Sequence, residues 1–154
     1  MARVGEFEFP DDLWFDVELD VWARQREDKS IVLGMTDPAQ ARAGRILHVR
    51  ARTGKSVEAG KSTATIESGK WVGPFPAPLK GTVLELNPLA AADPNLINRD
   101  PYGEGWIVRL QPSLPDWPQG NLLNGPEVAK RYEVKLTEEG FSCMLPPGGK
   151  KEDQ

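Results

Sequence analysis

The chain has 154 residues and a net charge of −4, a length typical of a single domain. Its 15 glycines and 14 prolines indicate many short elements joined by tight turns and argue against a helical bundle. One cysteine and one histidine exclude an intramolecular disulfide framework and any metal site or catalytic dyad that needs two imidazoles.

The distribution of charge and apolar residues restricts the possible partners. Lysine and arginine are scattered along the chain without a basic block, so we expect no nucleic acid partner. Residues 1–8 carry acids where a signal peptide needs apolar residues, and no run approaches the roughly 18 apolar residues of a membrane helix. We therefore expect a cytoplasmic monomer that does not bind a membrane.

The N-terminal part of the chain predicts two strands and a short helix. Apolar and acidic residues alternate over residues 15–21, which is typical of a strand, and residues 31–35 form a short apolar strand. Thr36 is a capping residue, and Pro38 follows it at a first helical position. We expect a helix that begins here and stops at Gly44.

The middle of the chain is rich in strand and turn signals. Strands are predicted at residues 46–50, 63–68, 81–87 and 105–110, with two turn units at residues 53–62 between the first two. Three prolines in residues 71–78 cannot donate to a central ladder and predict an edge-like or irregular extended segment. Asp93 and Pro94 predict the start of a short helix before the last strand. A weak repeat, Gly44-x-Ile46-x-x-Val49 and Gly81-x-Val83-x-x-Leu86, favours two stacked half-units and hence a mainly β sandwich.

The character of the chain changes after Leu110. A helix-like run follows Gly125, with Val128, Tyr132 and Leu136 on one face. The last residues lack the apolar content needed to order themselves. We divide the chain into a β domain of residues 1–110, a helical extension of residues 111–136 packed on it, and a flexible tail of residues 137–154.

Lys70 is the strongest candidate for a functional residue. It lies between two predicted extended segments, in the string Glu67-Ser68-Gly69-Lys70-Trp71, which places it at a hairpin tip. A lysine on a tight turn projects its amine away from the backbone, and this position suits acylation by a carboxylic cofactor. A solvated surface lysine is the more common role of such a residue, so position alone does not decide between them.

Several strings between residues 31 and 110 provide stronger evidence. They are Gly-Met-Thr-Asp-Pro-Ala-Gln from Gly34, Val-x-Ala-Gly from Val57, Ile-Glu-Ser-Gly-Lys from Ile66, Ala-Pro-x-x-Gly-x-Val from Ala77, and Leu-Ile-Asn-x-Asp-Pro-Tyr-Gly-Glu-Gly-Trp from Leu96. In this order and combination the chain resembles the H protein of the glycine cleavage system, a lipoyl carrier.

The resemblance implies a lipoyl hybrid barrel-sandwich with short peripheral helices and a lipoyl group in amide linkage to Lys70. The cofactor-binding residues are then Lys70 with its neighbours Glu67, Ser68, Gly69 and Trp71. Glu67 would mark the hairpin for a lipoate ligase or lipoyl transferase. Residues 102–106 would hold a turn beneath the second half, with Trp106 in the core. No catalytic residue and no metal site is implied, so we expect a carrier without an active site of its own.

Departures from the family pattern bear on the cargo of this carrier. The family has a His-Glu-Trp string on an early strand, but the corresponding stretch here, residues 18–22, reads Glu-Leu-Asp-Val-Trp and contains no histidine. His48 lies in a strand where a core or surface role is expected. Lys70 is followed by Trp71 and a proline-rich run. These features resemble the lipoate-binding proteins of a heterodisulfide-reductase-like sulfur-oxidation system, and on that basis we favour a sulfur or redox carrier serving such a complex. The alternatives are the aminomethyl carrier of the glycine cleavage enzymes and an unmodified adaptor. Cys143, near the end of the chain, is expected to be incidental.

Overall fold

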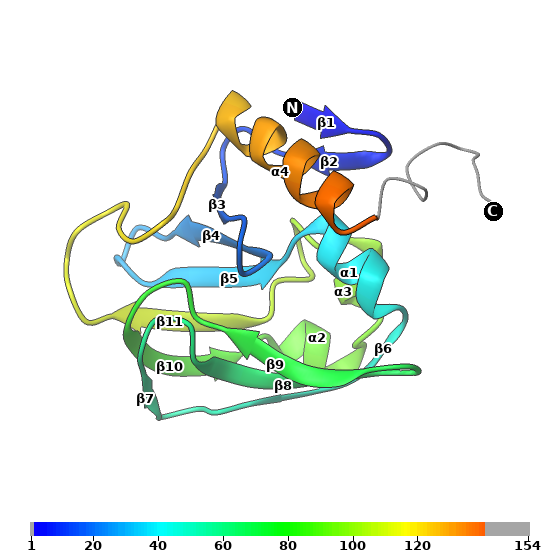
Figure 1. Cartoon of the computed structure of the whole chain (residues 1–154). Helices are drawn as coiled ribbons and strands as arrows, with labels where there is room; N and C mark the ends of the chain where they lie inside the picture. Colours follow the sequence, from blue (N-terminus) through cyan, green and yellow to red (C-terminus); the bar gives the residue numbers. More distant parts are fainter. Residues whose placement is uncertain (1, 141–154) are drawn as a thin grey trace.

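A computed structural model describes residues 2–140 of the chain. Two β-sheets enclose the main core (Figure 1). The larger sheet contains, in spatial order, β3 (Trp14–Asp16), β4 (Val21–Gln25), β5 (Ile31–Met35), β11 (Val108–Pro112), β10 (Gly81–Leu86) and β7 (Ser56–Val57). The smaller sheet contains β6 (Ile46–Ala51), β8 (Ser62–Ser68) and β9 (Val72–Pro76), and a separate hairpin contains β1 (Ala2–Val4) and β2 (Phe7–Phe9). The prediction of a mainly β fold with short peripheral helices is confirmed.

Apolar side chains from both sheets meet in one cluster between them. Leu33 and Leu110 of the larger sheet and Ile66 and Phe75 of the smaller sheet are all buried in it. Along β8 the buried and exposed residues alternate, because successive side chains of a strand point to opposite faces. One face of the smaller sheet is therefore core and the other is open to solvent.

In the described part of the chain, four helices lie around the sheets. They are α1 (Asp37–Ala43), α2 (Pro88–Ala92), α3 (Leu96–Arg99) and α4 (Pro126–Glu138). The predicted signals for α1 are confirmed: the Thr36 hydroxyl accepts a hydrogen bond from the Ala39 amide, Pro38 lies in the first turn, and Gly44 is the C-cap. None of the helices within residues 2–140 is long and apolar enough to cross a membrane.

Helix α4 packs beside the N-terminal hairpin in a second apolar cluster (Figure 1). Its buried residues are Val128, Tyr132 and Leu136, the face that the sequence predicts. The ring of Tyr132 stacks on that of Phe9 with 4.6 Å between the centroids. The helix continues to Glu138, two residues past the predicted end of the extension. The threefold division of the chain stays a prediction, and residues 141–154, including Cys143, lie outside the described residues.

Two local predictions are wrong. Residues 15–21 form no single strand: β3 ends at Asp16 and β4 begins at Val21, with a turn between them. The Asp16 carboxylate accepts a hydrogen bond from the Leu19 amide at 3.1 Å, and Asp20 adopts a left-handed φ of 61°, which aspartate tolerates better than most residues. The apolar residues of the alternating pattern are buried or half-buried, but they lie in the two strands of a hairpin and in the turn between them.

The second error concerns the start of the short helix after β10. Asp93 is the C-cap of α2 and begins no helix; the N-caps are Asn87 for α2 and Asn95 for α3. The side chain of Asn87 is buried and donates to two carbonyl oxygens of residues 104 and 106, so it ties α2 to the loop before β11. Proline follows both Asn87 and Asp93, and the local sequence alone does not distinguish them.

Trp106 also differs from the prediction of a core residue. It is half-buried at the edge of the second cluster, where the guanidinium of Arg26 lies 5.2 Å from the ring centroid. The tryptophan that occupies the core is Trp22, which is fully buried. Its indole N–H donates to the carbonyl of Pro101 at 2.8 Å, so the Pro-Tyr-Gly-Glu-Gly-Trp string closes over Trp22.

Candidate functional site

Lys70 lies in the turn that joins β8 to β9. The Ser68 amide donates to the Trp71 carbonyl at 2.7 Å and closes the turn, while the Ser68 hydroxyl accepts from the Lys70 amide at 3.3 Å. Ser68 is nearly buried, whereas Gly69 and Lys70 are exposed. The hydrogen bonds of the hairpin thus define the turn that carries Lys70 and leave its side chain accessible.

The Lys70 side chain does not point straight away from the protein, as a lysine on a bare turn would. Its stem lies against Gly44, where a methyl group would be 3.1 Å from Lys70 Cε. Gly44 has φ 83° and ψ −167°, a conformation that is essentially restricted to glycine. The end of α1 therefore guides the stem of the lysine.

Asn98 fixes the backbone around Gly44. Its side-chain amide donates to the Gly44 carbonyl at 2.8 Å and to Gln40 Oε1 at 3.0 Å, and its side-chain oxygen accepts from the Ile46 amide at 2.8 Å. These bonds join α3 to the end of α1 and the start of β6. The Leu-Ile-Asn string thus supports the surface over which the Lys70 stem lies.

A cleft of about 390 Å³ opens beside Lys70. The turn between β3 and β4, helix α1 and strand β9 contribute its walls. Its charged residues are Asp20, Arg42 and Lys70. The others are apolar: Leu19, Met35, Ala39, Ala43, Trp71, Pro74, Phe75 and Pro76. Trp71 lies over Gly73, where a methyl group would be 2.2 Å from the indole Cζ2, so the ring forms part of the cleft wall.

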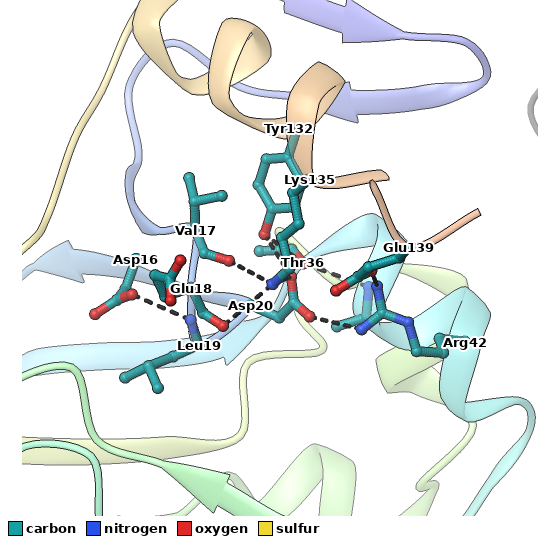
Figure 2. A network of polar contacts seen from close by, with 11 residues as sticks. Asp16, Val17, Glu18, Leu19, Asp20, Thr36, Arg42, Tyr132, Lys135 and Glu139 are labelled. Atoms are coloured by element: carbon teal, nitrogen blue, oxygen red, sulfur yellow. Dashed lines mark hydrogen bonds and ion pairs between the residues drawn. The ribbon is translucent and has the colours of Figure 1, made fainter. Parts of the chain in front are cut away.

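Asp20 and Arg42 belong to a polar network that reaches into α4 (Figure 2). One oxygen of Asp20 accepts from the Tyr132 hydroxyl at 2.8 Å and from Lys135 Nζ at 3.1 Å. The other oxygen accepts from Arg42 at 2.8 Å, and the same guanidinium donates to Glu139 at 2.7 Å. Burial raises the pKa of Tyr132 well above its usual value, so the hydroxyl keeps its proton and acts as the donor.

Glu67 lies on the solvent face of the smaller sheet. It pairs across the strands with His48 on β6 and Val72 on β9, and all three side chains are exposed. Two large apolar side chains, Leu47 and Val72, are 49% and 64% exposed close to the lysine turn. His48 is therefore on the outer face with Glu67 and does not line the cleft beside Lys70.

Of the five residues predicted at the site, Lys70 and Trp71 line the cleft, Ser68 and Gly69 form the turn, and Glu67 lies on the outer face of the sheet. The structure also adds residues that sequence reasoning missed. Arg42 lines the cleft, Gly44 lies against the Lys70 stem, and Tyr132 contacts Asp20 of the cleft wall; no local motif marks any of the three for this site, because only tertiary packing brings them there. Within residues 2–140 there is no group of three or more histidine, cysteine, aspartate or glutamate side chains that could hold a metal ion.

Comparison with known proteins gives a consistent result. The family model described as Glycine cleavage H-protein matches residues 14–135. A protein named Glycine cleavage system H protein 3, from Aquifex aeolicus, is 42% identical over 139 residues, which cover 88% of this chain and 86% of that protein. Probable glycine cleavage system H protein 2, from Sulfurisphaera tokodaii, is 40% identical over 146 residues and covers 93% and 98%.

A solved structure agrees with the fold. The crystal structure of a glycine cleavage system H protein from Mycobacterium marinum superposes with a TM-score of 0.69 at 30% sequence identity. The match covers 81% of this chain and 99% of the other. The sheets around the lysine turn thus belong to an architecture that has been observed experimentally.

Proposed function

This chain belongs to the glycine cleavage H-protein family, whose members carry a lipoyl group on a lysine, and we propose that Lys70 is the modified residue here. The observation that carries the proposal is the position of Lys70: an exposed amine on a closed hairpin turn, at the border of a cleft. Glu67 lies three residues earlier on the exposed face, where a lipoate ligase or lipoyl transferase can reach it. When bound, the group supplies a cyclic disulfide that opens on reduction or on attack by a thiol or carbanion.

The residues beside Lys70 fit such a group. A volume of about 390 Å³ lies within the usual range of roughly 300–1,000 Å³ for small-molecule sites. Most of the lining side chains are apolar, which suits a hydrocarbon chain and a ring of low polarity, and Trp71 and Phe75 exclude water from one wall. Gly44 directs the lysine stem along this wall. The chain presents and shelters the group, and the group supplies the reactivity, so we assign no catalytic step to the protein itself.

We propose glycine cleavage as the first candidate process, with an aminomethyl group as cargo and the glycine cleavage enzymes as partners. The family model and the relatives, which are named as glycine cleavage proteins, support this alternative over the sulfur-carrier function favoured from the sequence. They give no support to a heterodisulfide-reductase-like partner.

A sulfur or redox cargo remains the second candidate because of the charges in the cleft. Asp20 is the one acidic residue among the described residues that line it, and its two oxygens already accept from Arg42, Lys135 and Tyr132. A cationic aminomethyl group would have to compete with two cations for Asp20, whereas an uncharged or anionic sulfur group would not.

Mass spectrometry tests the proposed modification. Protein produced with an active lipoylating enzyme should gain the mass of one lipoyl amide, and peptide mapping should place it at Lys70. Lys70→Arg should abolish the gain without changing the melting temperature, because an exposed tip side chain contributes little packing. Lys80→Arg is the matched control: this exposed lysine pairs with Glu58 and lies outside the cleft lining, and the variant should be modified normally. An unmodified pool, or modification at another lysine, would contradict the proposal and favour an adaptor role.

A second experiment separates the two cargoes. The lipoylated protein is incubated with glycine decarboxylase and glycine, and release of carbon dioxide is followed. Turnover at a rate typical of an H protein supports glycine cleavage. A lipoylated protein that supports no release, but whose reduced arm takes up sulfur from an inorganic sulfur donor, would support the second candidate.

A further inference from the structure

The wall of the cleft beside Lys70 is tied to helix α4 through two charged side chains. Asp20 comes from the turn between β3 and β4, and Arg42 comes from α1. The carboxylate and the guanidinium therefore belong to different elements, and neither element alone determines the position of both. The two side chains meet in one ion pair at 2.8 Å, and α4 contacts Asp20 while its C-cap residue Glu139 contacts Arg42 (Figure 2).

Tyr132 is the most deeply buried member of this link. It is fully buried, and its ring is stacked on Phe9 from the N-terminal hairpin. Its hydroxyl donates to Asp20 at 2.8 Å and lies 3.2 Å from the Thr36 hydroxyl oxygen, just before α1. The packing fixes the ring, so the hydroxyl presents its proton to Asp20 from a constant position.

Lys135 supports the same turn from the next turn of α4. Its ammonium donates to the carbonyl of Val17 at 2.7 Å, to that of Glu18 at 3.1 Å, and to Asp20. Tyr132 and Lys135 therefore hold one oxygen of the Asp20 carboxylate, which leaves the other oxygen directed at Arg42. The orientation of Arg42 at the cleft follows from that of Asp20.

We propose that Tyr132 is a positioning residue for the cleft: its hydroxyl orients Asp20, Asp20 orients Arg42, and α4 thereby keeps the cleft in the form that shelters the group carried by Lys70. The inference rests on the proposed function, because it needs a modified Lys70. It adds a residue more than 60 positions away in sequence to the site, and it gives α4 a role beyond packing.

The aromatic ring and the hydroxyl of Tyr132 can be separated experimentally. Tyr132→Phe keeps the ring on Phe9 and removes the hydroxyl, which donates to Asp20 and also contacts the Thr36 hydroxyl. Tyr102→Phe is the matched control, because Tyr102 is the other tyrosine of the second cluster and its hydroxyl accepts from the Asp37 amide at 2.8 Å without lining the cleft. Tyr132→Phe loses the contacts to Asp20 at 2.8 Å and to Thr36 at 3.2 Å, whereas Tyr102→Phe loses the one to Asp37 at 2.8 Å, so the stability lost by each variant is measured by urea unfolding beside the rate.

The readout is the exposure of the carried disulfide. The full-length lipoylated protein is mixed with a phosphine reductant under pseudo-first-order conditions, and the rate of ring opening is compared with that of free lipoamide. The wild type and Tyr102→Phe should react more slowly than lipoamide and at equal rates. Tyr132→Phe should react at least about threefold faster than the wild type, and Lys135→Met, which removes a second donor to Asp20, should change the rate in the same direction.

The outcomes separate this inference from the proposed function. If Lys70 carries no lipoyl group in any variant, the proposed function fails and the inference fails with it. If Lys70 is lipoylated but folded Tyr132→Phe and Lys135→Met react at the wild-type rate, only the positioning role is refuted. If Tyr102→Phe accelerates the reaction as much as Tyr132→Phe, a general loss of stability explains the effect and the role is also refuted. Should Tyr132→Phe not fold, Lys135→Met decides.

Discussion

Replacing Gly44 with alanine should destabilise the protein through the backbone and not through the lysine beside it. Gly44 ends α1 with φ 83° and ψ −167°, and its carbonyl accepts from Asn98 at 2.8 Å. An added methyl group would lie 3.1 Å from Lys70 Cε, the far part of a flexible side chain. The lysine can move by the few tenths of an ångström required, but the backbone is held by Asn98 and cannot relax.

The expected cost follows from the backbone angles. A non-glycine residue held in this region costs about 1–3 kcal/mol. For a chain of this size, each kcal/mol lowers the melting temperature by roughly 2–4 °C. Gly44→Ala should therefore lower the melting temperature by several degrees. Gly69→Ala, in the lysine turn, is the matched control: no atom lies within 4 Å of its added methyl group and its φ is not positive, so little change is expected.

A double variant identifies the cause. Thermal unfolding is followed by circular dichroism for Gly44→Ala, Lys70→Ala and the combination of both. If backbone strain dominates, removal of the lysine stem leaves the loss caused by Gly44→Ala unchanged. Backbone strain at Gly44 is refuted if Gly44→Ala melts within about 1 °C of the wild type, or if adding Lys70→Ala restores most of the lost stability.

Two further predictions concern the larger sheet and the turn before β4. Gly34→Ala would place a methyl group 2.4 Å from the indole of Trp22, which a hydrogen bond to Pro101 holds in place, and overpacking of this kind costs about 1–3 kcal/mol. The loss in the free energy of unfolding, measured in urea, should be smaller when the same substitution is made in Trp22→Phe. An equal loss in both backgrounds would argue against the clash. Burial, aided by Glu18, raises the pKa of Asp16, so the carboxyl group stabilises the fold at pH values below its unfolded pKa and this contribution is lost as the pH rises through its folded pKa. The melting temperature of Asp16→Asn minus that of the wild type should therefore increase as the pH is raised from 4 to 7. A difference that stays constant over this range would contradict the raised pKa of Asp16.

The sequence predicts the surroundings of Lys70 well because the signals there are local. The glycine and serine before the lysine, the prolines after it and the alternating strand at residues 62–68 together define a hairpin with an edge strand, and β9 is such an edge. Helix α1 is equally local, since its cap, its proline and its terminal glycine lie within nine residues. These elements need little information from the rest of the chain.

The cleft could not be predicted in the same way. Its walls come from Asp20, Arg42 and Phe75, which are separated by more than 20 residues and meet only through tertiary packing. Periodicity also misled at residues 15–21, where the apolar positions are buried in a hairpin and its turn, not in one strand. Tyr132 illustrates both cases: the helical pattern predicts that its ring is buried, but nothing in that pattern indicates that its hydroxyl reaches Asp20.

The exposure of the charged groups indicates which part of the cleft wall can move. The side chains of Asp20 and Lys135 are only 12% and 17% exposed, whereas those of Arg42 and Glu139 are 42% and 39% exposed. Exposed ion pairs contribute at most about 1 kcal/mol, so the contact between Arg42 and Glu139 can open at little cost while Asp20 stays fixed. A carrier must release its arm to each partner, and a sheltered state that is favoured by only a small free energy allows this. In the proposed arrangement, the buried Tyr132 therefore fixes the cleft wall at Asp20, and the exposed Arg42 forms the part of the wall that can move to release the arm.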